Sequence, residues 1–383
     1  MQNKQPGFLS RIAGFRIEWL LAGCWALVQG LLLYQHGIET AYEATKYIAE
    51  ADNLIEKGTV STPNFWLYST QIFLIAAIKQ IHAGYWLVAL VHWMMNALAT
   101  AALFRLITSL SDRVTAAIIT LVFIFNFPIQ TYNSFLQTES LFHSFTILFS
   151  CYLLQLRAFN LARAIQVFLF LLLICFTRPT GLLWVPGTLL YLFFRFFRRF
   201  SFGLKLGITL GGSLGFLFFL NQALGSGGEL DFMLPFRDER IICGVPTLPH
   251  FVDIKVSDNP NSLQGLWYYI THNFSQFIRL AAIRSRAFFG MQRDYYSSGH
   301  NVYLAIYFYP FLLLALGGIV SWWKQSKYLL LYCLPVIGLT WLTVILTCDD
   351  WHNRFFLTIV PYIYILSVPM VKLARDRFHY GSH

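Results

Sequence analysis

The feature that most constrains this chain is a series of long apolar stretches separated by short polar segments. A helix needs roughly 20 mainly apolar residues to cross a bilayer, and helices satisfy their own backbone hydrogen bonds in lipid. The pattern therefore predicts an all-α polytopic membrane protein with about ten transmembrane helices. The expected spans are residues 17–36, 85–107, 114–130, 139–156, 160–177, 181–197, 204–222, 302–322, 328–346 and 355–372.

Composition supports a membrane protein and argues against a nucleic-acid-binding one. Hydrophobic residues make up 57% of the chain and charged residues 12%, a balance that is unusual for soluble domains. The formal net charge is +10, but the cations are scattered at the ends of the apolar stretches, where they act as topology signals. We therefore expect membrane lipids around the chain and no nucleic-acid partner.

Charged residues divide between the two ends of the expected spans. One side, called here the basic side, holds clusters of Lys and Arg and only three carboxylates, Glu18, Asp112 and Asp376. Because cytoplasmic loops collect Lys and Arg, the opposite, acid-rich side is predicted to be extracytoplasmic, and chemistry that uses carboxylates should lie there. The cations of the basic side are Lys4, Arg11, Arg16, Arg105, Arg113, Arg157, Arg163, Arg195, Arg198, Arg199, Lys205, Lys324, Lys327, Lys372, Arg375 and Arg377.

The short stretches 160–177 and 181–197 allow two interpretations, because Arg178-Pro179 lies between them. They form either one kinked crossing or two crossings with Arg178 at the outer turn. A single crossing would place the arginines of 195–199 on the acid-rich side, against the charge distribution. We therefore favour two crossings.

The segment 37–84, the first outer loop, is too long to be a simple connection. From Glu39 to Lys57 its polar and apolar residues recur on opposite faces of a helix, which predicts an amphipathic helix lying on the membrane. Gly58 provides a stop signal. The aromatic and apolar run 65–81 is interrupted by polar residues and predicts a second interfacial helix.

The segment 223–300 is the second long outer loop. It opens with a glycine-rich stretch and becomes amphipathic after Pro260. We expect an extended loop with one or two surface helices and no independent core. The whole chain, 1–383, is therefore expected to form a single transmembrane domain.

Glu43 is the first candidate for chemistry. It lies on the polar face of the expected helix just after the first span, with Lys46 and Tyr47 within about one turn of it. This position suits a general base at the mouth of a membrane cavity, although a solvated surface charge is the alternative. Glu39 and Asp52 are further candidates for the same role.

Glu139 is the second carboxylate of interest. It follows the polar stretch 130–134 and directly precedes an apolar run. A carboxylate at the edge of a span is unfavourable unless it faces water or a partner, which indicates function. The alternative is a charge favoured by the dipole at a helix N-terminus.

Arg178 stands on the acid-rich side beside Pro179 and Gly181, which interrupt the helix. An arginine recognises phosphate through two parallel hydrogen bonds, so this position suits a lipid-phosphate ligand. A snorkelling anchor is the alternative interpretation.

The turn 348–354 carries a dense set of polar side chains. His352 and Arg354 are candidate phosphate-binding residues, and Asp349 with Asp350 is a weak candidate site for a divalent cation; no cofactor is otherwise indicated. Cys348 and Cys243 lie outside the spans on the acid-rich side, so a bridge between them is open but not favoured by the spacing. The histidines at 36, 82, 92 and 143 are interpreted as structural.

The order of these motifs resembles the glycosyltransferase C superfamily, and within it the protein mannosyltransferase and lipid A aminoarabinose transferase type. The resemblance covers most of the chain, with Glu at position 43 where the family usually has Asp. The matching residues are Glu43, Tyr47, Ala51, Leu54 and Gly58 along one helix, Thr138-Glu139-Ser140-Leu141, the turn Arg178-Pro179-Thr180-Gly181, and Arg354-Phe355 with Pro361.

The resemblance implies an enzyme that moves a sugar from a polyprenyl-phosphate donor to a hydroxyl of a glycan, lipid or protein acceptor, with inversion. Glu43 would be the base and Glu139 would orient it or the acceptor. The expected phosphate-binding residues are Arg178, Arg354, His352, Lys46 and Tyr47.

Two other classes of protein remain open. One is a secondary transporter or flippase for a lipid-linked or anionic solute, although no internal repeat is visible. The other is a non-catalytic partner of an envelope-synthesis complex. A bacterial inner membrane is the preferred location, and the endoplasmic reticulum is the alternative.

Overall fold

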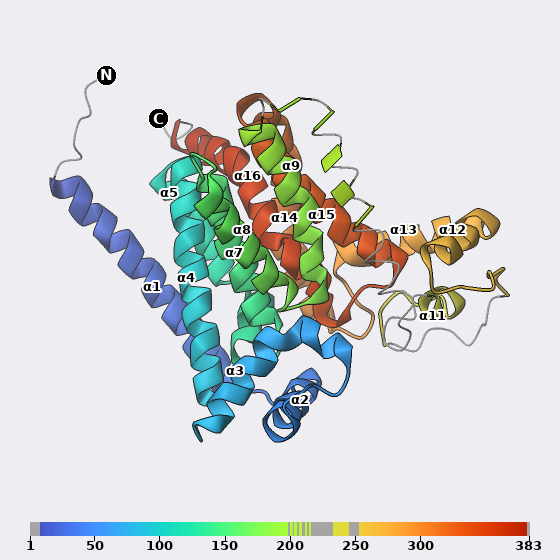
Figure 1. The fold of residues 1–383 in the computed structure, drawn as a ribbon. Helices are drawn as coiled ribbons and strands as arrows, with labels where there is room; N and C mark the ends of the chain where they lie inside the picture. The colour runs from blue at the N-terminus through green and yellow to red at the C-terminus, as the bar shows by residue number, and fades with distance from the viewer. Residues whose placement is uncertain are drawn as a thin grey trace. The chain divides into compact units, whose positions relative to one another are not determined.

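Figure 1 shows a computed structural model of the chain. It describes residues 8–197, 233–244 and 253–380, together with 200–201, 203–204, 207–208, 211–212 and 214–215. Regular structure in these residues is helical, apart from two isolated β-bridges. The expected all-α class is confirmed.

The described helices divide into five long ones and a set of shorter ones. The long helices are α1 (Phe8–His36), α4 (Trp86–Leu110), α14 (Ser298–Gln325), α15 (Lys327–Leu346) and α16 (Arg354–Tyr380). The others are α2 (Glu43–Lys57), α3 (Ser69–Gln80), α5 (Arg113–Ile124), α6 (Phe127–Gln130), α7 (Glu139–Gln155), α8 (Leu161–Cys175), α9 (Trp184–Phe196), α11 (Leu234–Arg237), α12 (Leu263–His272) and α13 (Phe274–Gly290), with the 3₁₀ turns η1 (Pro63–Tyr68), η2 (Thr131–Ser134), η3 (Pro179–Leu183) and η5 (Trp351–Asn353).

The expectation of about ten spans is wrong for the described residues. Five helices are long and apolar enough to cross a membrane, and a pair bent by 61° would raise the number to six if it were one span. This supports an integral membrane protein with several apolar helices. The five are Ile17–His36, Trp86–Leu110, Ser298–Gln325, Lys327–Leu346 and Trp351–Arg377, and the bent pair is Arg113–Ile124 with Phe127–Ser134.

Three expected spans are shorter in the structure than the apolar runs suggested. Helices α7, α8 and α9 have 17, 15 and 13 residues, against roughly 20 for a straight crossing. The apolar runs extend past the helix ends: α8 ends at Cys175, and the 3₁₀ turn η3 takes the first residues of the next run before α9 begins at Trp184. The expected span 204–222 lies mostly outside the described residues.

The chain forms two compact units, each assembled from separate segments. Unit 1 comprises Met1–Val185, Leu314–Leu329 and Pro361–His383, and unit 2 comprises Pro186–Leu313 and Leu330–Val360. In unit 1, α4 packs along α5 and α7, and α1 packs against α5. In unit 2, α12 packs against α13, and Phe236 and Tyr269 lie in a small core beside them, so the second outer loop carries the surface helices that the sequence predicts.

The first outer loop lies in unit 1, and its helix α3 packs against the N-terminal end of α4 (Figure 1). The predicted amphipathic helix is present as α2, with Tyr47 and Ala51 buried against α3. It ends as expected at Gly58, which has φ 71° and donates from its backbone to Leu54 O at 3.1 Å. The second predicted helix is divided into η1 and α3.

All three carboxylates of the basic side are paired with arginines in unit 1. Arg113 lies 3.1 Å from Glu18, and Arg375 is ion-paired with both Asp112 and Asp376. These pairs join the beginning of α5 to α1 and to the end of α16. These three helix ends, which the charge pattern assigns to one membrane face, therefore lie together.

Candidate functional site

Backbone hydrogen bonds join three segments of unit 1 that are distant in the sequence. Glu39 N donates to Ser134 O and Leu136 N donates to Glu39 O, each at 3.0 Å. Thr70 N donates to Phe176 O at 3.1 Å. The first outer loop is thereby fixed to the residues just before Glu139 and to the turn just before Arg178.

Glu139 and Arg178 form a buried ion pair at this junction. Arg178 Nη1 donates to Glu139 Oε1 at 2.5 Å, and the exposed fractions of the two side chains are 11% and 0% respectively. The guanidinium carbon also lies 5.9 Å from the centre of the Phe142 ring. The sequence predicts both residues as candidates, but it does not predict that they bind each other.

The turn that carries Arg178 depends on a glycine. Gly181 N donates to Arg178 O at 2.9 Å. A Cβ at Gly181 would lie 2.6 Å from Ile174 O, closer than real contacts allow. The glycine therefore lets η3 pack onto the end of α8 and holds Arg178 at a fixed distance from α7.

Tyr47, a buried residue of helix α2, lies near enough to this ion pair for its charges to act on the phenol. Burial raises the pKa of its phenol well above the ordinary value of 10.0, the charges of Glu139 and Glu43 raise it further, and Arg178 opposes them. The ring also packs 5.6 Å from that of Tyr68. The structure thus gathers four predicted site residues, Glu43, Tyr47, Glu139 and Arg178, in one region of unit 1.

The three candidate bases differ in their surroundings. Asp52 is ion-paired with Lys79, away from the other candidates. The carboxylate of Glu39 accepts from Ala41 N at 2.7 Å in an exposed turn. Glu43 is half-buried and its charge acts on Tyr47, so the surroundings favour Glu43 over the two alternatives.

Lys46, the remaining unit 1 candidate, is exposed on α2. Nearby, Glu50 is buried, and its carboxylate accepts from Ser61 N at 2.7 Å and from Ser61 Oγ at 2.5 Å. Glu50 therefore fixes the connection after α2, a structural role that its position in the sequence does not reveal.

Buried polar groups surround Glu139, and the sequence did not predict how they bond to one another. Gln29, Gln130, Asn133 and Ser140 form a buried hydrogen-bonded chain, with Ser140 Oγ donating to Asn133 Oδ1 at 2.7 Å. His143, one turn after Glu139, is buried, and neither ring nitrogen has a hydrogen-bond partner among the described residues. The spacing of four residues predicts that His143 lies on the same face of the helix as Glu139.

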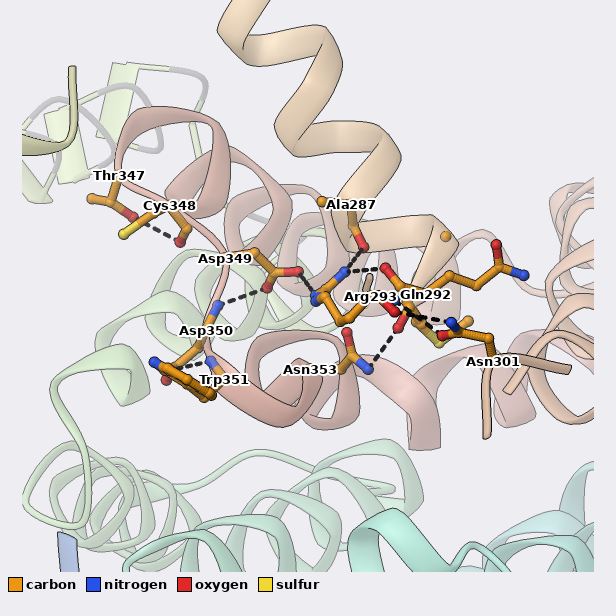
Figure 2. Close-up of polar contacts among 12 residues, drawn as sticks. Ala287, Gln292, Arg293, Asn301, Thr347, Cys348, Asp349, Asp350, Trp351 and Asn353 are labelled. Carbon is orange, nitrogen blue, oxygen red and sulfur yellow. Dashed lines mark hydrogen bonds and ion pairs between the residues drawn. The ribbon is translucent and has the colours of Figure 1, made fainter. Parts of the chain in front are cut away.

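The remaining predicted site residues lie in unit 2, in the turn 348–354, which is fixed by ion pairs and hydrogen bonds. Arg354 Nη2 donates to Asp350 Oδ1 at 2.8 Å, and both side chains are largely buried. Figure 2 shows Asp349 ion-paired with Arg293, whose guanidinium also donates to Ala287 O at 2.8 Å. Asp349 and Asp350 are therefore each engaged by an arginine. Within the described part of the chain, no group of three or more His, Cys, Asp or Glu is placed to hold a metal ion.

The bridge between Cys243 and Cys348, which the sequence did not favour, is present in unit 2. Cys243 N donates to Asp349 O at 2.7 Å and Asp349 N donates to Ile241 O at 2.8 Å. This pairing brings the two cysteines to a Cα–Cα distance of 5.4 Å. Spacing in the sequence gave no indication of the pairing, because 105 residues separate them.

The same turn contains backbone strain at His352. His352 and Asn353 have φ 55° and 58°, a left-handed conformation that is uncommon for residues other than glycine. The His352 side chain is exposed and its ring lies 6.3 Å from that of Tyr296, while Asn353 Nδ2 donates to Met291 O at 3.0 Å. Strain of this kind persists where the surroundings hold it, and functional sites are one such place.

Comparisons with family models, with curated proteins and with solved structures found no match to this chain.

Proposed function

We propose that this chain is a membrane glycosyltransferase that uses a polyprenyl-phosphate-linked sugar as donor, as its resemblance to the glycosyltransferase C superfamily implies. The observation that carries the proposal is the buried Glu139–Arg178 ion pair, with Glu43 and Tyr47 beside it. A base, a fixed cation and a second carboxylate are the groups that such a transfer needs.

In the proposed reaction, Glu43 accepts the proton of an acceptor hydroxyl while that oxygen attacks the anomeric carbon of the sugar. The bond between the anomeric carbon and the phosphate oxygen breaks, and polyprenyl phosphate leaves with the bonding electrons. A single displacement inverts the anomeric configuration. General-base assistance of this kind contributes about 10²–10⁴-fold.

The cations have a complementary role in this proposal. Arg178 and Lys46, both in unit 1, stabilise the charge that develops on the departing phosphate. Arg354 and His352 lie in unit 2, and their part in phosphate binding stays a prediction from the resemblance. Glu139 holds the Arg178 guanidinium in one orientation through their ion pair. Preorganised charge of this kind needs no rearrangement when the reaction occurs.

We place the reaction on the extracytoplasmic face of a bacterial inner membrane, with the endoplasmic reticulum as the alternative. Disulfides persist in oxidising compartments, and the bridged Cys243 and Cys348 lie on the acid-rich side of the expected topology. The positive-inside rule gives the same direction.

The test is a purified-protein assay with polyprenyl-phosphate-linked hexose and pentose donors and a membrane extract as acceptor. The wild type should release polyprenyl phosphate, which neither a transporter nor a non-catalytic partner does. Glu43→Gln should lower the rate by at least about 10²-fold. Asp52→Asn, on the same helix and ion-paired elsewhere, should leave it unchanged. No release with any donor, or equal rates for Glu43→Gln and Asp52→Asn, would overturn the proposal.

A further inference from the structure

A groove of about 380 Å³ lies in unit 1, between α14 and the last turns of α16. It is lined by Leu314, Met370, Leu373, Ala374 and Arg377. The groove is mainly apolar and has a single charged residue in its wall. Its volume falls within the range of ligand pockets in proteins, roughly 300–1,000 Å³.

The shape of the groove follows from the packing of the two helices. A Cβ at Gly318 of α14 would lie 1.9 Å from Leu366 O of α16, so the backbones touch there. The α16 residues of the groove, at 370, 373, 374 and 377, have the spacing of one helix face. The seven steps of 1.5 Å from residue 370 to residue 377 give this face a length of about 10 Å. The groove is thus a stripe along α16 that ends at Arg377.

Arg377 is placed to take an anion at that end. Its neighbour Arg375 is already engaged by Asp112 and Asp376. Arg377 is exposed, and no ion pair of its side chain is found among the described residues. It lies at the basic ends of the helices, where the charge pattern predicts the cytoplasmic leaflet, which is rich in anionic lipid.

We propose that this groove binds an anionic diacyl phospholipid. One acyl chain lies along Met370, Leu373 and Ala374 toward Leu314, and Arg377 donates hydrogen bonds to the headgroup phosphate. The charge of Arg377 complements the headgroup, and the apolar stripe accepts a chain that enters from the lipid. A free phosphate ion would use the arginine alone and leave the stripe without a role. The site is separate from Glu43, Glu139 and Arg178 and does not depend on the proposed sugar transfer.

The experiment is a lipid titration of the purified full-length protein in detergent, with the first bound lipid followed by native mass spectrometry. Dioleoylphosphatidylglycerol and dioleoylphosphatidylcholine are the probes, because they share acyl chains and differ in charge. The wild type should bind the anionic lipid about fivefold more tightly, as expected for one arginine near the membrane surface. Inorganic phosphate at millimolar concentration should not compete.

Three variants and one control test the assignment. Arg377→Gln should reduce the ratio of the affinities for the anionic and the zwitterionic lipid to near one. Leu373→Trp should fill the stripe and weaken binding of both lipids, with a thermal melt to verify folding; Leu314→Trp serves the same purpose from α14. Arg157→Gln, an exposed arginine of the same side, should retain the wild-type preference. An unchanged preference in Arg377→Gln, unchanged binding in both folded tryptophan variants, or competition by phosphate would overturn the proposal.

Discussion

At the residue scale, the mutual burial of Glu139 and Arg178 determines which substitutions are informative. The Glu139 side chain has no exposed surface, and Arg178 is 11% exposed. Removing one partner of a buried ion pair leaves an uncompensated charge, which costs about 3–5 kcal/mol. Replacing both partners together avoids that penalty.

We therefore expect Arg178→Ala to lower the free energy of unfolding by about 3–5 kcal/mol. The double variant Glu139→Gln/Arg178→Gln should lose clearly less than the sum of its single variants, because neither buried charge remains. Denaturant unfolding in mild detergent, arranged as a double-mutant cycle, measures the coupling. Additive effects would show that the two side chains do not interact.

Tyr47 gives a prediction about pH. Its phenol has a pKa raised well above 10.0, first by burial and then by Glu139 and Glu43. A raised pKa keeps the proton on the phenol, so Tyr47 stays neutral throughout the physiological range. Tyr47→Phe should therefore leave both limbs of the pH–rate profile in place, even if the rate falls. A basic limb that disappears in Tyr47→Phe would contradict this assignment.

At the scale of elements, the sequence predicted local features and missed the long-range ones. The amphipathic helix α2 and its end at Gly58 follow from periodicity and from one glycine. The pairing of Glu139 with Arg178 joins residues 39 positions apart and depends on the turn at Gly181. No pattern within a single helix contains that information. Helix lengths were overestimated because apolar runs extend past the helix ends: the expected span 181–197 begins in the 3₁₀ turn η3, and α9 starts only at Trp184.

The disulfide shows the same limitation and gives a testable outcome. The bridge closes a separation of 105 residues between Cys243 and Cys348. Loss of a native disulfide commonly costs about 2–5 kcal/mol, so Cys348→Ser should destabilise the fold by an amount in that range. Peptide mapping without reduction should recover the linked peptides. Two free thiols in protein isolated from an oxidising compartment would contradict the structure.

At the scale of the whole molecule, the charge distribution predicts which ends of the apolar helices face the cytoplasm. In unit 1, Glu18, Asp112 and Asp376 are paired with arginines at adjoining helix ends, and the division of the whole chain into two sides stays a prediction. The number of crossings was less predictable, because it depends on where each helix stops.

The predicted orientation is tested by cysteine labelling in intact cells. The cysteine introduced in the Lys46→Cys variant should react with a membrane-impermeant maleimide added outside the cells, because Lys46 is exposed and lies on the predicted acid-rich side. The Cys of Arg157→Cys, exposed on the basic side, should react only after permeabilisation. Reversed labelling would place the carboxylates in the cytoplasm and remove the basis for an extracytoplasmic reaction.

An experimental structure with a polyprenyl-phosphate lipid bound tests the central claim most directly. We expect the lipid phosphate within hydrogen-bond distance of the Arg178 guanidinium, about 2.7–2.9 Å between heavy atoms, with Glu43 facing the same ligand. A phosphate bound at the basic side, or one that leaves Arg178 engaged by Glu139 alone, would contradict the proposed sugar transfer.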